Sequence, residues 1–144
     1  MLSFNNSFNP GTSSTSGSVA LLVLRLAAGT FMLSHGFGKL MMLLGDGPIQ
    51  FLDPIGVGVT TSLLLTVFAE FFCSIFLIFG FATRLSSVPL LITMLVAAII
   101  VHAPDEFGRK ELPLIYAVIY FAFILLGAGK YSVDQFLFQR FGRK

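Results

Sequence analysis

The chain has 144 residues, of which 56% are hydrophobic and only 11% are charged. An average soluble domain is roughly 45–50% apolar and about 25% charged. A water-facing globule of this length could not bury so much apolar surface, so the composition excludes an ordinary soluble domain and indicates that a lipid bilayer surrounds most of the chain. The formal net charge is +2 with no basic run longer than two residues, so we expect no nucleic-acid partner.

The first two apolar segments, 19–44 and 59–81, are each long enough for a membrane-spanning helix, which needs about 20 apolar residues. Two further segments follow at 88–102 and 112–129. The expected fold class is therefore all-α, an integral membrane four-helix bundle over residues 19–129. Because the third segment is short for a full crossing, we expect its ends near the headgroups, or a continuation of the helix into the next loop.

Local signals predict several helix boundaries. Ser87 followed by Pro89 is typical of an N-cap with a proline in the first turn, which makes residues 82–86 a linker and the second and third spans an antiparallel hairpin. The glycines of the run 127–129 predict the end of the fourth span. Residues 103–111, the most charged connection, are expected to form a solvated loop.

The two chain ends are predicted to lie outside the bundle. Residues 1–18 are rich in Ser, Asn, Gly and Thr and carry no charged side chain, so we expect a disordered polar tail. In the C-terminal segment 130–144, Ser132 and Gln135 have the spacing of a capping box, which predicts a short amphipathic helix. Its apolar stripe suits a location on the membrane surface, and packing against the bundle is an equal alternative.

Lysine and arginine predict the orientation, because they are enriched in cytoplasmic loops. If both termini are cytoplasmic, five of these residues lie inside and three lie outside. The inner five are Arg84, Lys130, Arg140, Arg143 and Lys144, and the outer three are Lys39, Arg109 and Lys110. We therefore expect a multi-pass protein of the cell inner membrane with cytoplasmic termini.

The few ionisable side chains within the spans are the candidate site residues, because a charge at mid-membrane costs on the order of 2.5–3.5 kcal/mol on insertion scales. The candidate polar pocket comprises Arg25, His35, Lys39, Glu70 and His102. At 100° per residue, Arg25 and Lys39 fall on one stripe of the first span. Glu70 is the only acid deep in the membrane, which makes it their natural counter-charge.

Two interpretations of these residues stay open. In the first, Arg25 and Glu70 form an interhelical ion pair that fixes which helix faces meet, while Lys39 extends outward to the headgroups. In the second, Arg25, His35 and Glu70 line a pocket for a quinone headgroup, a small anion or a proton. The two histidines on different spans could also hold a haem, but no further haem signature accompanies them.

The sequence has few other groups that could carry out a reaction. Its single cysteine, Cys73, lies in an apolar stretch, which excludes an internal disulfide and a CxxC dithiol centre. There is no nucleophile–base pair, phosphate-binding loop or cluster of metal ligands in the sequence. The sequence therefore predicts no metal site, identifies no resident cofactor and assigns no enzyme class. Any redox chemistry would depend on a bound molecule, such as a quinone, or on a partner protein.

Short motifs follow one another along the chain in a specific order. They are Arg25-Leu26, His35-Gly36-Phe37-Gly38-Lys39-Leu40, Glu70, Gly80-Phe81-Ala82-Thr83-Arg84, His102 and Gly127-Ala128-Gly129-Lys130-Tyr131-Ser132-Val133-Asp134. Over about residues 19–138 this ordered set resembles the DoxX family of small four-helix bacterial inner-membrane proteins. The resemblance implies a four-helix membrane bundle. It marks as positions to test Arg25, His35, Lys39, Glu70, Arg84 and His102.

Three functional hypotheses follow. Relatives in that family include the DoxD-type subunit of thiosulfate:quinone oxidoreductase and members associated with membrane thiol-redox complexes. The resemblance implies a membrane subunit associated with a quinone- or thiol-linked redox complex. The first hypothesis is that it binds quinone between the first and second spans and receives electrons from a partner redox protein. The alternative is a non-enzymatic membrane scaffold whose buried charges are structural. A carrier with a Glu70–His35 proton relay is less favoured, because no repeated or discontinuous helices are evident. The sequence does not indicate an oligomeric state.

Overall fold

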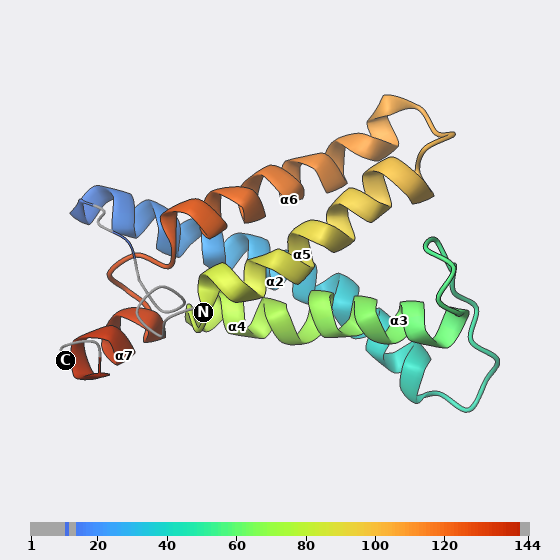
Figure 1. Cartoon of the computed structure of the whole chain (residues 1–144), viewed down its shortest axis with the longest axis horizontal. Coiled ribbons are helices and arrows are strands. Elements are labelled where there is room, and N and C mark those ends of the chain that lie inside the picture. Colours follow the sequence, from blue (N-terminus) through green and yellow to red (C-terminus); the bar gives the residue numbers. More distant parts are fainter. Residues whose placement is uncertain (1–10, 12–13, 142–144) are drawn as a thin grey trace.

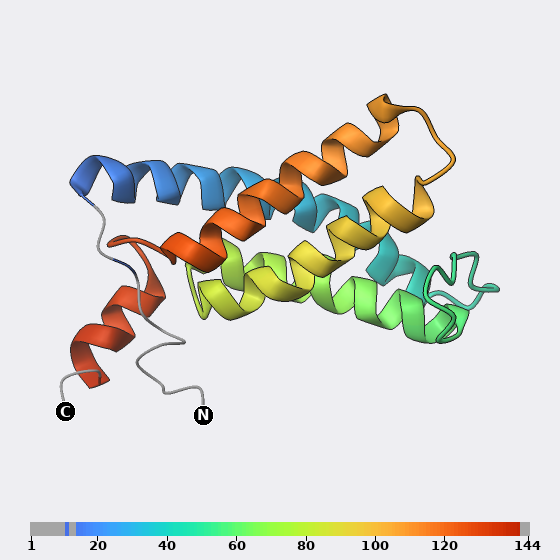
Figure 2. The ribbon, with the colours of Figure 1, turned by 45° about the horizontal axis from the view of Figure 1, so that its top comes forward.

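The apolar segments of the sequence form four long helical units in the computed structural model, which describes residues 11 and 14–141. No strand occurs among these described residues. The units cross one another in a bundle, with the short helix α7 at one end and the connections 45–58 and 102–106 at the other (Figures 1 and 2). We call these the α7 end and the loop end. The expected all-α bundle is thereby confirmed.

The first unit is the helix α2, which spans Thr15–Leu44. It begins four residues before the predicted start at Val19, because the Ser14 hydroxyl caps it by accepting a hydrogen bond from the Gly17 N–H (3.1 Å). Of the tail predicted to be disordered, residues 15–18 therefore belong to a helix. Most of the remaining tail lies outside the described residues.

The second unit is continuous but changes its winding in the middle. It comprises α3 (Val59–Val67), the π-helical segment η1 (Phe68–Cys73) and α4 (Ser74–Phe79). A π-helical turn is wider than an α-helical turn and often occurs at functional sites. Here it contains Glu70, the acid that the sequence places deep in the membrane.

The third unit comprises α5 (Thr83–Val96) and η2 (Ala97–Val101), so it begins five residues before the predicted start at position 88. The predicted linker over 82–86 and the predicted N-cap at Ser87 are wrong. Ser87 lies inside the helix, where its hydroxyl donates to the carbonyl of the preceding turn. The helix does not continue into the next loop either, because it ends at Val101; its additional residues lie at its N-terminal end.

A distant residue supplies the cap that the sequence did not indicate. The two carboxylate oxygens of Asp134 accept hydrogen bonds from the backbone N–H groups of Ala82 (2.6 Å) and Thr83 (2.9 Å). Ala82 adopts a positive φ of 47°, which turns the chain sharply between α4 and α5. The start of α5 is therefore set by a contact 51 residues away in sequence rather than by its own residues.

The fourth unit is α6, which spans Phe107–Leu126. It begins earlier than the predicted position 112, so the charged residues 109–111 lie in its first turns and not in a solvated loop. The helix ends where the glycines predict, with Gly127 at a φ of +80°. After it, α7 spans Val133–Phe141, and its Ser132 cap accepts from the Gln135 N–H (3.2 Å) as the capping box predicts.

Three of the helical units described here are long and apolar enough to cross a membrane: Thr15–Leu44, Val59–Phe79 and Thr83–Val101. The fourth, α6, has 20 residues with its charges confined to the loop end. Large apolar side chains such as Phe31, Phe79 and Val118 lie exposed on the outer faces of the bundle. This is the surface expected of a chain whose solvent is lipid, so the protein is an integral membrane protein.

Candidate ligand-binding site

An ion pair joins α2 to η1 in the half of the bundle toward the loop end. Lys39 Nζ donates to Glu70 Oε2, and the Glu70 side chain is only 3% exposed whereas that of Lys39 is 27% exposed. The predicted pairing of Glu70 with Arg25 is therefore wrong. Arg25 lies 14 residues before Lys39 on α2, which separates their backbones by roughly 21 Å along the helix axis.

Gly36 explains why Lys39 is the partner. A Cβ atom at Gly36 would lie 2.5 Å from the carbonyl carbon and oxygen of Glu70, so the backbones of α2 and η1 are in direct contact there. Lys39 follows Gly36 by three residues and lies on the same face of the helix. Because Gly36 has no side chain, α2 and η1 can approach closely there, and this contact brings Lys39 to Glu70.

A cavity of about 470 Å³ lies beside this ion pair. Its walls come from α2, η1, α5, η2 and α6, and His102 follows η2 directly. The lining residues are Met32, His35, Lys39, Glu70, Met94, Ala97, His102, Gly108, Arg109, Leu112, Pro113 and Tyr116. Four of the five candidate pocket residues are thus brought together, and Arg25 is not among them. That they form a functional site stays a prediction.

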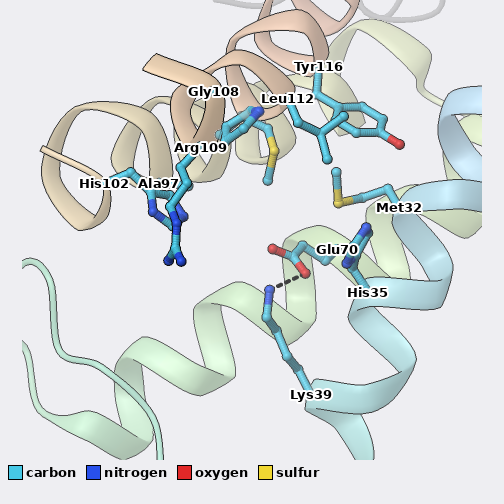
Figure 3. A pocket seen from close by; sticks show the side chains of 12 residues that line it. Met32, His35, Lys39, Glu70, Ala97, His102, Gly108, Arg109, Leu112 and Tyr116 are labelled. Atoms are coloured by element: carbon cyan, nitrogen blue, oxygen red, sulfur yellow. Dashed lines mark hydrogen bonds and ion pairs between the residues drawn. The ribbon is translucent and has the colours of Figure 1, made fainter. Parts of the chain in front are cut away.

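The cavity combines an apolar floor with an ionisable rim. Met32, Met94 and Tyr116 are buried and form part of the floor. Figure 3 shows Lys39 and Glu70 on one side of the space, with Arg109 extending toward them from α6. Such a cavity suits a ligand with a flat apolar body and polar atoms at its edge.

Arg109 and Tyr116 were not among the predicted pocket residues. Because the sequence predicts a solvated loop at Arg109, its position on a helix was not predicted. The two residues are seven positions apart in α6 and therefore share one helix face, about 20° apart. An earlier predicted start for the fourth span would have placed both on one face of that helix.

His102 lies at the mouth of the cavity and is held by an acid of the following turn. Its Nδ1 is 2.7 Å from Asp105 Oδ2. This hydrogen bond is the main reason that the pKa of Asp105 lies below its usual value. Because Asp105 therefore stays ionised at neutral pH, it orients the imidazole and leaves Nε2 for other partners.

Arg25 lies near the α7 end and has a different set of neighbours. The side chain is 1% exposed, and its Nη2 donates to the Tyr131 carbonyl (2.6 Å). Its Nη1 lies so close to Gly80 that a Cβ atom there would be 1.6 Å away. Asp134 is the charge that acts on it electrostatically. Arg25 thus fastens the C-terminal segment to the bundle, and Arg84 similarly donates to the Ile124 carbonyl across α5 and α6.

Within residues 11 and 14–141, no group of three or more His, Cys, Asp and Glu side chains is arranged to hold a metal ion.

The fold and its cavity define a small helical membrane protein with a polar cavity between its spans. The sequence model of the DoxX family matches residues 20–103, which is more than half of the chain. The protein therefore belongs to the DoxX family, and the matched part contains Lys39, Glu70 and His102. No curated protein and no solved structure matches the chain.

Proposed function

We propose that the protein is the membrane subunit of a redox system and that the cavity beside Lys39 and Glu70 binds the headgroup of a quinone. The observation that carries the proposal is the pairing of an apolar floor with cationic donors inside a lipid-facing bundle. A quinone ring is flat and apolar, and methionine sulfur and aromatic faces pack well against such rings. Lys39 and Arg109 supply donors for its carbonyl oxygens.

Reduction of a quinone to a quinol consumes two electrons and two protons. A carboxyl group and an imidazole can take up and release protons, so Glu70 and His35 are the groups that we assign to proton transfer. The electrons come from a partner redox protein, which would dock at the loop end, where the exposed Arg109 and the partly exposed His102 line the cavity. This assignment favours the redox-associated hypothesis for the cavity.

The alternative, a scaffold whose buried charges are structural, is supported at the other end of the bundle. Arg25 and Asp134 connect the C-terminal segment to α2 and α5 and line none of the cavities described here. We therefore separate the polar residues into two groups, with a structural role at the α7 end and ligand binding at the loop end. We further propose an inner-membrane location with both termini in the cytoplasm, which puts the cavity mouth on the outer face.

A binding experiment with a blocked cavity tests the proposal. Gly108 lines the cavity, and nothing lies within 4 Å of a Cβ atom built there, so Gly108→Phe adds a bulky side chain at the cavity wall without a clash at its Cβ atom. Gly47 lies in the connection 45–58 and is equally open, which makes Gly47→Phe the matched control. Purified protein in lipid nanodiscs is photolabelled with an azido-benzoquinone. We expect labelling of the wild type and of Gly47→Phe, and its loss in Gly108→Phe. Equal labelling of all three would contradict the proposal.

A further inference from the structure

Two smaller cavities continue from the headgroup cavity, by which we mean the cavity of about 470 Å³. A middle cavity of about 240 Å³ shares four lining residues with it, namely Lys39, Glu70, Ala97 and His102. A third cavity of about 270 Å³ shares Pro54, Thr66, Thr93 and Val96 with the middle one. Because neighbouring cavities share wall residues, the three lie next to one another in a row, from the ion pair to the space between α3–η1 and α5.

The third cavity, which we call the slot, differs from the others in chemistry. No ionisable side chain is among its lining residues. Its two threonines use their hydroxyl protons on their own helices, Thr66 on the Ser62 carbonyl (2.8 Å) and Thr93 on the Pro89 carbonyl (2.9 Å). A polar ligand group would therefore find few hydrogen-bond partners in the slot, so a hydrocarbon chain suits it best.

The slot also opens sideways. Three of its large lining side chains, Leu65, Phe68 and Ile92, are half-exposed on the outer face of the bundle. These residues belong to helical units that are long and apolar enough to span the membrane. Their exposed faces therefore meet lipid, and a chain lying in the slot could extend from the protein directly into the bilayer.

We propose that the slot takes the isoprenoid tail of the quinone whose headgroup lies beside Lys39 and Glu70. This inference rests on the proposed function and specifies its substrate class: a long-tailed prenylquinone that enters laterally from the bilayer. The arrangement of the three cavities in a row with shared wall residues carries it, because the head and the tail of one molecule must occupy adjoining spaces. The tail leaves the headgroup cavity past the ion pair, under the connection 45–58.

The experiment compares two probes in nanodiscs. One is a tailless dimethoxybenzoquinone, and the other is the same ring with a long isoprenoid tail that bears a photoreactive diazirine. Thr93 lines both the middle cavity and the slot, so Thr93→Phe obstructs the tail but leaves the headgroup cavity open. Thr30 lies exposed on α2 away from all three cavities, so Thr30→Phe is the matched control.

We expect Thr93→Phe to weaken binding of the long-tailed probe by about tenfold, because an overpacked passage excludes the tail. Binding of the tailless probe is expected to stay unchanged, and Thr30→Phe should bind both probes like the wild type. In the wild type the diazirine should label residues 65–68 and 92–96. This label map decides the question by itself if Thr93→Phe fails to fold.

Three results would overturn the inference. If the long-tailed probe binds Thr93→Phe as well as the wild type, or labels the bundle elsewhere, the slot is not its path, although the proposed function stands. If a diazirine phospholipid labels the slot and the long-tailed quinone does not displace it, the slot is a site for bilayer lipid. If the wild type binds neither probe, the proposed function fails together with the inference.

Discussion

Lys39 and Glu70 form an ion pair beside the backbone contact that α2 and η1 make at Gly36. Both residues also line the headgroup cavity and the middle cavity. A ligand in the headgroup cavity therefore meets a carboxylate that already has a counter-charge and a lysine that is partly exposed. The pair has two consequences, because it holds two helices together and sets the charge that a ligand encounters.

Gly36→Ala should destabilise the protein and weaken the ion pair. Its Cβ atom would lie 2.5 Å from the Glu70 backbone, so α2 and η1 must separate, at a cost of about 1–3 kcal/mol for an overpacked contact. Gly38→Ala is the control on the same helix, because nothing lies within 4 Å of a Cβ atom there. Thermal unfolding in detergent measures both. A Gly36→Ala protein as stable as Gly38→Ala would show that the close contact is not important.

Removal of either partner of the ion pair should have unequal costs. Lys39→Met leaves the nearly fully buried Glu70 carboxylate without a counter-charge, which we expect to cost about 3 kcal/mol. Glu70→Gln should cost less, because the partly exposed Lys39 side chain can turn toward the lipid headgroups at the membrane surface. The double variant should resemble Glu70→Gln in its free energy of unfolding. Equal costs for the two single variants would contradict this account.

Asp134→Ala should release the C-terminal segment. The change removes two hydrogen bonds that cap α5, and a lost N-cap costs about 1–2 kcal/mol. Trypsin cleavage after Lys130 measures the release, and we expect faster cleavage than in the wild type. Replacing the exposed Phe136 and Phe141 with Ser should have a smaller effect. If the phenylalanine variant is cleaved faster, the membrane surface and not Asp134 holds the segment.

The connection 45–58 should loosen as the pH falls. Asp53 accepts hydrogen bonds from Ser62 Oγ (2.7 Å) and from the N–H groups of Val57 and Gly58, and the Ser62 bond is the main cause that lowers the pKa of Asp53. The folded-state pKa of Asp53 lies below its unfolded-state pKa. The stability that the Asp53 carboxylate contributes is therefore complete above the unfolded-state pKa and is lost as the pH falls through the folded-state pKa.

Amide hydrogen exchange compares the wild type with Asp53→Ala. At neutral pH the Val57 and Gly58 amides should exchange more slowly in the wild type, and the difference should disappear in acid. A difference that persists well below the folded-state pKa of Asp53 would mean that another interaction orders this connection.

The lysine and arginine distribution predicts the orientation of the bundle. A reporter active only in the cytoplasm should work when it is fused after Lys144, and a reporter active only after export should work when it is inserted near Gly108. The reverse pattern would place the cavity mouth on the cytoplasmic face.

Much of the fold could be predicted because lipid leaves a strong pattern in the sequence. Long apolar runs gave the helices, and the glycines of 127–129 gave the end of α6. The start of α5 could not be predicted, because its cap comes from Asp134 at the far end of the chain. Ser87 and Pro89 predict a helix start at position 87, but the hydrogen bonds from Asp134 place the start at Thr83.

The candidate site shows the same limit. Which of two cations on one stripe of α2 pairs with Glu70 depends on where the backbones touch, and that point is Gly36. The sequence showed a glycine there without showing what faces it. Arg109 was missed because its helix starts five residues before the predicted position 112. Depth along a helix can be estimated from sequence, whereas contacts between helices depend on packing.

The most direct test of the central claim is to measure what the protein carries from its own membrane. Wild type, Gly108→Phe and Gly47→Phe are purified in mild detergent, and bound small molecules are extracted and quantified by mass spectrometry. The account predicts a stoichiometric quinone with the wild type and with Gly47→Phe, and a strong loss with Gly108→Phe. A wild type with no more quinone than an unrelated membrane protein purified in parallel would contradict it.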